Sequence, residues 1–289
     1  MAEFHIAFIW VSSLALPLLS RLQRLPENWR RRLRLLINYF QRNFYQQLLF
    51  FILPIYYFSA SWGTGNMVFV LLVAASALLA TMDIIYDRYL SRRWLVLAMF
   101  FAFNLFACIN VMLPIVWNFK NSFALRLSAL LALAGFASFC LTLREVSGRD
   151  RLLLVLAAAL LLAGVSEVGR PLIPPAPLRL TASRFYLDFD PESTQAQPPL
   201  THLPAGGPYK IYALTAISAP LGLKDRVGHR WYLNGRLVHA SPFFTVQGGR
   251  KTGFRFWTFR TLKNILPDST LLIELRTEAG QLIGRARLH

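Results

Sequence analysis

Long apolar runs, separated by short polar segments, fill roughly the first 170 residues of the chain. The runs cover residues 4–20, 44–62, 66–86, 94–117, 123–143 and 152–168. Each holds about 17 to 24 residues, and a helix of that length crosses a hydrocarbon core of roughly 30 Å. We therefore expect a bundle of about six transmembrane helices over residues 1–169. The first run is short and contains Pro17, so a helix lying in the membrane interface is its alternative.

The composition agrees with the membrane class. Hydrophobic residues make up 55% of the chain and the mean hydropathy is +0.42. A soluble protein of this size needs more polar surface to cover its core. A large soluble α/β protein is the alternative, but its strands would give short apolar segments rather than long ones.

A basic segment, residues 21–42, follows the first run. Its arginines are Arg21, Arg24, Arg30, Arg31, Arg32 and Arg34. Leu33, Leu36, Ile37 and Phe40 recur at helical spacing, which predicts an amphipathic helix. Arginines on such a helix attract anionic lipid headgroups, at about 1 kcal/mol each. We therefore expect a lipid bilayer with anionic headgroups as one partner.

Positive charge is distributed unevenly between the connections of the predicted bundle. The segments after the first, third and fifth runs hold nearly all the arginines, whereas those after the second and fourth hold only Lys120. Arginine-rich loops stay in the cytoplasm. This orientation predicts a multi-pass protein of a bacterial inner membrane with its C-terminal domain in the periplasm. The net charge of +17 then needs no nucleic acid as a partner.

The chain changes character at the proline-rich segment 170–177, which we interpret as a stiff linker. Residues 178–289 show about seven short alternating segments with turn signals between them, typical of a small antiparallel β-sandwich. Asn234-Gly235 predicts a tight hairpin turn, because both positions need a positive φ. A second turn is expected at Glu278-Ala279-Gly280.

Motifs of the C-terminal segment carry a family resemblance. They are His229-Arg230-Trp231-Tyr232, Gly248-Gly249-Arg250, Gly253-Phe254-Arg255 and the ending from Thr277 to Arg285. This segment resembles a bacterial family known only as domain of unknown function 2914, in its membrane-anchored form. The resemblance implies membrane helices followed by a small β domain, and it implies no activity. The chain departs from that pattern at Ser269–Glu274, where an aromatic residue and an arginine are missing.

Some polar residues within or next to the apolar runs are candidates for a function in the membrane. They are Asp83, Asp87, Asn104, Asn110 and Glu167. Asp83 and Asp87 share a helix face, and a buried pair could bind a cation or relay protons, but nearby arginines make ion pairing the simpler interpretation. The two asparagines favour hydrogen bonds between helices over a polar path. Glu167 could pair with Arg170, three residues on.

Metal and cofactor chemistry have little support in the sequence. A two-residue turn at Asn234-Gly235 pairs Arg230 with His239 and places His229 and His239 on opposite faces, which disfavours a shared metal. The two cysteines, Cys108 and Cys140, lie in apolar runs at different depths, too far apart for a disulfide. No short catalytic or phosphate-binding motif occurs. We predict no metal and no cofactor.

Aromatic residues are abundant in the β domain. In the segment 254–259, Phe254 and Phe256 alternate with Arg255, Trp257 and Phe259, so the two sets lie on opposite faces of a strand. An exposed face of arginine and aromatic side chains suits a glycan or a protein partner. The predicted partner-binding residues are Arg255, Trp257, Phe259, Arg230 and His239.

These observations favour a non-enzymatic inner-membrane subunit or scaffold, whose outer β domain binds a periplasmic protein or envelope partner. Other membrane or periplasmic proteins are its expected partners. One alternative is a transporter or channel component with a polar path through Asn104, Asn110 and Asp83. The other is an envelope enzyme that acts on lipid or glycan.

Overall fold

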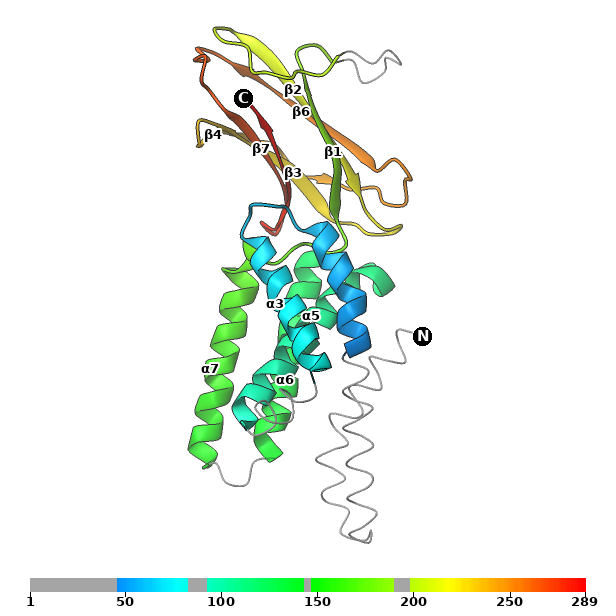
Figure 1. Ribbon diagram of the computed structural model, residues 1–289, viewed down its shortest axis with the longest axis vertical. Helices are drawn as coiled ribbons and strands as arrows, with labels where there is room; N and C mark the ends of the chain where they lie inside the picture. The colour runs from blue at the N-terminus through cyan, green and yellow to red at the C-terminus, as the bar shows by residue number, and fades with distance from the viewer. Residues whose placement is uncertain (1–45, 83–92, 143–146, 190–197) are drawn as a thin grey trace. The chain divides into compact units, whose positions relative to one another are not determined.

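The computed structural model describes residues 46–82, 93–142, 147–189 and 198–289 (Figure 1). The chain divides into two compact units. The first holds Leu71–Asn110, Leu125–Glu167 and the described residues up to Pro54. The second holds Ile55–Val70, Val111–Ala124 and Val168–His289, so it combines the ends of several helices with the β domain.

The helices are rich in alanine and leucine, which favour helix formation and leave few polar groups to satisfy. They are a helix over 46–59, α3 (Asn66–Thr81), α5 (Trp94–Trp117), α6 (Asn121–Thr142), α7 (Gly148–Glu167) and the short 3-10 helix η2 (Arg170–Leu172). Gly135 of α6 lets α5 approach closely, because a Cβ there would lie 3.0 Å from the Leu105 side chain. Ala98, Phe136 and Cys140 form a small buried cluster.

Two described helices are long and apolar enough to cross a membrane. They are Trp94–Trp117, with a hydropathy of 2.2, and Asn121–Cys140, with 1.8. α3 has only 16 residues, or about 24 Å at 1.5 Å per residue. α7 carries Arg149, Asp150 and Arg151 in its first turn and ends at Glu167, which leaves too short an uncharged stretch. The prediction of about six transmembrane helices is therefore wrong.

Other predicted segments of the helical half fall partly or wholly outside the described residues. The run 4–20 and the basic segment 21–42 lie there completely, as does the end of the run 66–86. The runs 94–117, 123–143 and 152–168 each coincide closely with one helix, namely α5, α6 and α7. The sequence thus located these helices, although it overestimated how many could span a bilayer.

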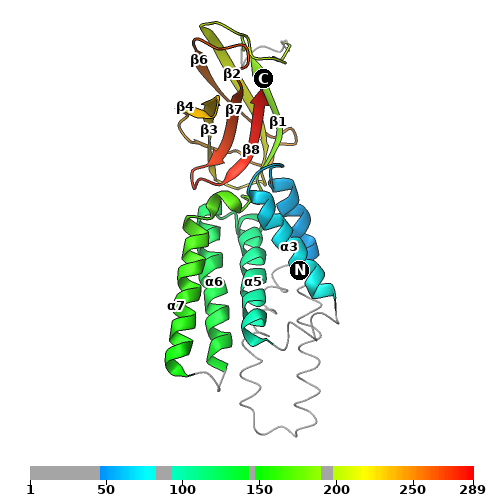
Figure 2. The same ribbon diagram turned by 60° about the vertical axis from the view of Figure 1, so that its left-hand side comes forward.

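The β domain consists of two antiparallel sheets, which Figures 1 and 2 show as two layers of strands. One sheet has the order β1-β2-β6, and the other has the order β4-β3-β7-β8, with β5 also paired to β3. The strands are β1 (Arg179–Tyr186), β2 (Tyr209–Ser218), β3 (Arg226–Leu233), β4 (Arg236–Ala240), β5 (Phe244–Thr245), β6 (Phe254–Leu262), β7 (Leu271–Thr277) and β8 (Leu282–Leu288). The expected antiparallel β architecture is present.

The core of the domain lies between the two sheets. Ile211 and Ala213 of β2 meet Trp231, Leu271 and Ile273 of the facing sheet. A second cluster includes Ile217, Val227 and Phe256. Inward residues alternate with outward ones along β2, as expected for a strand with one buried face. Trp231 is fully buried, and its loss would cost about 3–5 kcal/mol.

The β3–β4 hairpin has the predicted turn but a different register. Asn234 and Gly235 have φ values of 50° and 79°, and Leu233 pairs with Arg236. A bulge at Val238 then shifts the register, so that Trp231 pairs with His239 and Arg230 with Ala240. Val238 packs against the core, which accounts for the extra residue. The predicted pairing of Arg230 with His239 is therefore wrong.

Candidate functional site

The outer face of the three-stranded sheet carries a cluster of aromatic side chains. We call it the aromatic surface, and its members are Tyr186, Phe189, Tyr212, Trp257, Phe259 and Lys210. Trp257 is 39% exposed and Phe259 is 46% exposed. Large aromatic groups normally lie inside a small domain, so the exposure of these two makes the face a candidate site.

The register of the three strands places the aromatic side chains next to one another. Tyr186 of β1 pairs with Tyr212 of β2, which pairs with Phe259 of β6, so three rings form one row across the sheet. Trp257 lies two residues before Phe259 on the same face. Phe189 follows β1, and its ring centroid lies 5.6 Å from Tyr186 and 5.8 Å from Trp257. Such cross-strand and ring contacts hold the side chains in place.

A lysine covers part of this row. The Lys210 Nζ atom lies 4.3 Å from the ring centroid of Phe259 and 5.0 Å from that of Tyr212. Each cation–π contact at an exposed site contributes about 0.5–1 kcal/mol. These contacts favour a position of the lysine over the two rings, so a positive charge lies beside the aromatic side chains.

The charge of this sheet has one sign. Its three strands contain no aspartate and no glutamate, and their five cationic residues are Arg179, Arg184, Lys210, Arg255 and Arg260. Arg255, Trp257 and Phe259 share the outer face, as the alternation predicted, whereas Phe256 is buried in the core. The surface can therefore offer rings and positive charge together.

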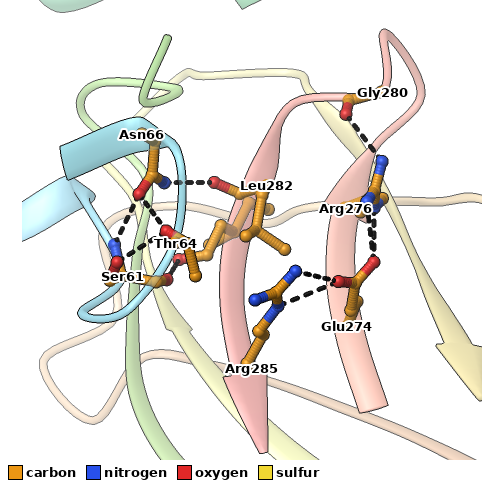
Figure 3. Close-up of polar contacts among 9 residues, drawn as sticks. Ser61, Thr64, Asn66, Glu274, Arg276, Gly280, Leu282 and Arg285 are labelled. Carbon is orange, nitrogen blue, oxygen red and sulfur yellow. Dashed lines mark hydrogen bonds and ion pairs between the residues drawn. The ribbon is translucent and has the colours of Figure 1, made fainter. Parts of the chain in front are cut away.

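The opposite sheet carries a different polar cluster, shown in Figure 3. Arg285 of β8 binds Glu274 Oε1 through Nε and Nη2, at 2.9 and 2.7 Å. Arg276 binds Oε2 in the same way, at 2.8 and 2.7 Å. Burial alone would raise the pKa of Glu274, but the hydrogen bond from Arg285 and the charge of Arg276 outweigh it and lower the pKa. The cluster keeps an ionised carboxylate on the sheet face.

The start of β8 is bonded to the connection before α3, as Figure 3 also shows. Ser61 Oγ donates to the Ile283 carbonyl at 3.2 Å, and Asn66 Nδ2 donates to the Leu282 carbonyl at 3.4 Å. The side-chain oxygen of Asn66, Oδ1, also accepts from the Ser61 backbone N–H and the Thr64 hydroxyl. These bonds use backbone groups at an edge strand, so their role is to attach the connection to the domain.

A second attachment involves a buried acid. Asp225 accepts hydrogen bonds from the backbone N–H of Asn121, at 3.1 Å, and from its side-chain amide. Burial raises the pKa of Asp225, and the hydrogen bonds from Asn121 only partly oppose this. Asn121 is the first residue of α6, where an acceptor satisfies a free backbone N–H. The bond therefore joins the start of a helix to the β domain.

The remaining predicted partner-binding residues lie on the other sheet. Arg230 of β3 pairs in register with Glu274, so it shares a face with the arginine–glutamate cluster and not with Trp257. His239 lies opposite the buried Trp231. The structure thus brings Arg255, Trp257 and Phe259 together and separates them from Arg230 and His239. Sequence reasoning missed Tyr212, although its alternation with Ile211 and Ala213 was a usable signal.

His229 and Trp231 are two positions apart on β3, and both point to its inner face. Trp231 pairs with His239, so His239 lies on that face as well. The prediction that the two histidines point to opposite faces is wrong because of the bulge at Val238. His229 Nε2 lies 3.0 Å from the Thr215 hydroxyl, and Nδ1 lies 2.8 Å from the Thr258 hydroxyl. No cluster of three metal-binding side chains occurs within the described residues.

Of the polar residues in the apolar runs, Asn104 is fully buried and bonds to Ser76 Oγ of α3. Asn110 is also buried in α5. Glu167 pairs with Arg126 of α6 at 2.9 Å. Asp83, Asp87 and the six arginines of the segment 21–42 lie outside the described residues. The bond of Asn104 agrees with a role in helix packing.

Comparison with known proteins gives a family without an activity. No curated protein and no solved structure matches the chain. Domain of unknown function 2914, which the C-terminal motifs resemble, is not matched either. A different family, described as a family of unknown function (DUF5924), matches residues 2–206, which is more than half of the sequence. The chain therefore belongs to the DUF5924 family.

Proposed function

We propose that the protein is a non-enzymatic membrane subunit or scaffold, whose β domain binds a protein partner through the aromatic surface. One observation carries this proposal: Trp257 and Phe259 are exposed and contact Tyr212 on a sheet whose strands contain no acidic residue. Tryptophan, tyrosine and arginine dominate the binding energy of protein interfaces. A partner that covers exposed aromatic side chains removes their apolar surface from water, and this burial favours binding.

Membrane insertion of α5 and α6 is the second part of the proposal. Both helices have the length and hydropathy of a span. Arg92 and Arg93 precede α5, and Arg144, Arg149 and Arg151 follow the apolar part of α6, whereas the connection between the helices holds only Lys120. The positive-inside rule then puts the arginine-rich ends in the cytoplasm.

The bond between Asn121 and Asp225 supports a location for the β domain. Asn121 begins α6 at the end that carries Lys120, and Asp225 belongs to the β domain. If the arginine-rich ends are cytoplasmic, the β domain lies on the opposite side of the membrane. In a bacterium with two membranes, that compartment is the periplasm.

The charge of the sheet supports an acidic partner. Arg184, Lys210 and Arg255 share the outer face with the rings, and the three strands add no acid, so this face repels a basic surface and attracts an acidic one. Lys210 lies above the ring row, so an acidic side chain of the partner could reach it while apolar groups cover Trp257 and Phe259.

The experiment compares two variants of the full-length chain, each tagged and extracted from its native membrane in mild detergent. Trp257→Ala with Phe259→Ala removes the centre of the aromatic surface. Leu237→Ala with Leu266→Ala removes exposed apolar side chains elsewhere and is the control. We expect a stoichiometric protein companion with the wild type and the control, and at least a thirtyfold loss of affinity, about 2 kcal/mol, in the first variant. Equal retention by both variants would refute the proposal.

An alkaline wash of the membranes tests the second part independently. A protein with two spanning helices stays in the membrane fraction when peripheral proteins are released. Release of the wild type into the wash would refute membrane insertion, even if the aromatic surface proved to bind a partner.

A further inference from the structure

The turn between β2 and β3, residues 219–225, is fixed against the connection between α5 and α6. Gly222 has a φ of +88°, and a Cβ at this position would lie 2.9 Å from the Asn118 side chain. Three residues later, Asp225 accepts the hydrogen bonds of Asn121. All these residues belong to the same compact unit. The turn is therefore held next to the point where α5 ends and α6 begins.

Backbone contacts on another side make the turn rigid. A Cβ at Gly248 would lie 1.8 Å from the Pro220 carbonyl oxygen, and one at Gly249 would lie 2.7 Å from a methyl group of Leu221. Only glycine allows this approach. The two adjacent glycines of the β5–β6 connection thus let its backbone pack directly against the backbone of the turn, which gives the turn a defined place.

The side chains presented by the turn and the connection are apolar or cationic. Leu221 is 79% exposed, Trp117 and Phe119 are exposed, and Lys120 and Lys224 are exposed as well. Within residues 117–121 and 219–225 the only acid is Asp225, which is buried and hydrogen-bonded. Exposed tryptophan, leucine and lysine together at the end of an apolar helix are typical of a membrane–water interface.

We propose that Leu221, Trp117 and Phe119 lie in the headgroup region of the bilayer, and that Lys120 and Lys224 bind the phosphates of anionic phospholipids. The β domain would then be held on the membrane surface by lipid as well as by its bonds to the helix ends. This inference rests on membrane insertion of α5 and α6, but it does not depend on a protein partner at the aromatic surface.

The position of the turn favours lipid over a protein as the occupant. α5 and α6 are the two described helices with the properties of a span, and the connection between them must lie where they leave the membrane. Any side chain fixed beside this connection is therefore close to the headgroups. Juxtamembrane lysines contribute roughly 1 kcal/mol each in binding to anionic lipid.

The experiment places an environment-sensitive fluorophore on single cysteines of the full-length protein in lipid nanodiscs. Cys108→Ala and Cys140→Ala remove the native thiols. Leu221→Cys reports on the turn, Leu130→Cys on an exposed position of α6, and Leu266→Cys on an exposed loop of the β domain. Two quenchers are compared: a nitroxide carried by lipid near the headgroup, and iodide in the water.

We expect the Leu221 probe to be quenched by the lipid nitroxide and protected from iodide, whereas the Leu266 probe shows the opposite. Iodide quenching at Leu221 with lipid protection at Leu130 would overturn the inference while leaving membrane insertion intact. Iodide quenching at both would overturn insertion itself. Protection at Leu221 in native membranes but not in nanodiscs of pure lipid would mean that a protein covers the turn, and would also overturn the inference.

The charge is tested by changing the lipid. Discs with phosphatidylglycerol should increase nitroxide quenching at Leu221 relative to discs of phosphatidylcholine alone. Lys120→Gln with Lys224→Gln should abolish that increase, and Lys251→Gln with Lys263→Gln, the matched control, should keep it. The same increase in both double variants would refute binding of phosphate by Lys120 and Lys224.

Discussion

Acidification should weaken the β domain through His229, and the structure gives both the sign and the magnitude. Thr215 Oγ1 donates to the Phe256 carbonyl and so accepts from His229 Nε2. Thr258 Oγ1 accepts from Trp231 Nε1 at 3.0 Å and keeps its own proton, which it can donate to Nδ1 of a neutral His229. A neutral imidazole with its proton on Nε2 satisfies this network, which joins the two sheets.

Burial lowers the pKa of His229 from 6.5 to about 3. Between these two values the unfolded chain binds a proton that the folded domain does not bind. The free energy of unfolding therefore falls as the pH falls below 6.5, at up to about 1.4 kcal/mol per pH unit. Between about pH 7.5 and pH 5 the loss amounts to about 2 kcal/mol.

Amide hydrogen exchange of the full-length protein in nanodiscs measures this change. The exchange rates of a peptide from β3, corrected for the intrinsic effect of pH, give the opening free energy of the strand. His229→Gln is the control, because it has no titrating group in this pH range. We expect a loss of about 2 kcal/mol in the wild type that is absent from the variant. An equal loss in both would refute the assignment to His229.

Three further substitutions test other parts of the unit, each followed by the same exchange measurement. Glu274→Gln should lower the free energy of unfolding by about 2 kcal/mol near neutral pH, because it leaves two arginines without their acid. Since the folded-state pKa of Glu274 is lowered, the stability that its charge contributes should also be lost on strong acidification. Gly248→Ala should lower the free energy of unfolding more than Gly280→Ala, by about 1–3 kcal/mol, because a Cβ at Gly248 would lie 1.8 Å from the Pro220 carbonyl oxygen and one at Gly280 meets no atom within 4 Å. Equal losses would contradict this. Asp225→Ala should speed exchange at the start of α6 by roughly fivefold to a hundredfold, as expected when a buried hydrogen bond worth about 1–3 kcal/mol is lost.

Local chemistry made part of the β domain predictable. The turn at Asn234-Gly235 follows from two neighbouring residues, and the opposed faces of Phe256 and Trp257 follow from alternation along one strand. The register beyond the turn did not follow, because the bulge at Val238 is decided by packing against residues of other strands. A tight turn fixes the first pair of a hairpin, whereas later pairs depend on the core.

The pattern of the sequence did not predict contacts between residues that are far apart in the chain. Asn121 and Asp225 are separated by 104 positions, and neither belongs to a motif. Glu274 occurs where the strand departs from the pattern of the family that the C-terminal motifs resemble. Glu274 and Arg276 are two positions apart and so share one face of β7, but the second partner, Arg285, comes from another strand. The number of spans was overestimated for a related reason, because apolar runs were counted without knowing which charged residues each helix includes.

The notable side chains of the second unit are of two kinds, buried polar groups and exposed apolar groups, and the difference bears on function. Glu274, Asp225 and His229 are satisfied within the chain, since each has hydrogen-bond partners that match its charge or tautomer. Groups of this kind stabilise the fold and leave little to offer a ligand. Trp257 and Leu221 instead expose apolar area that the described part of the chain does not cover. Because burial of such area is what favours association, partners are expected at these two places rather than at the buried charges.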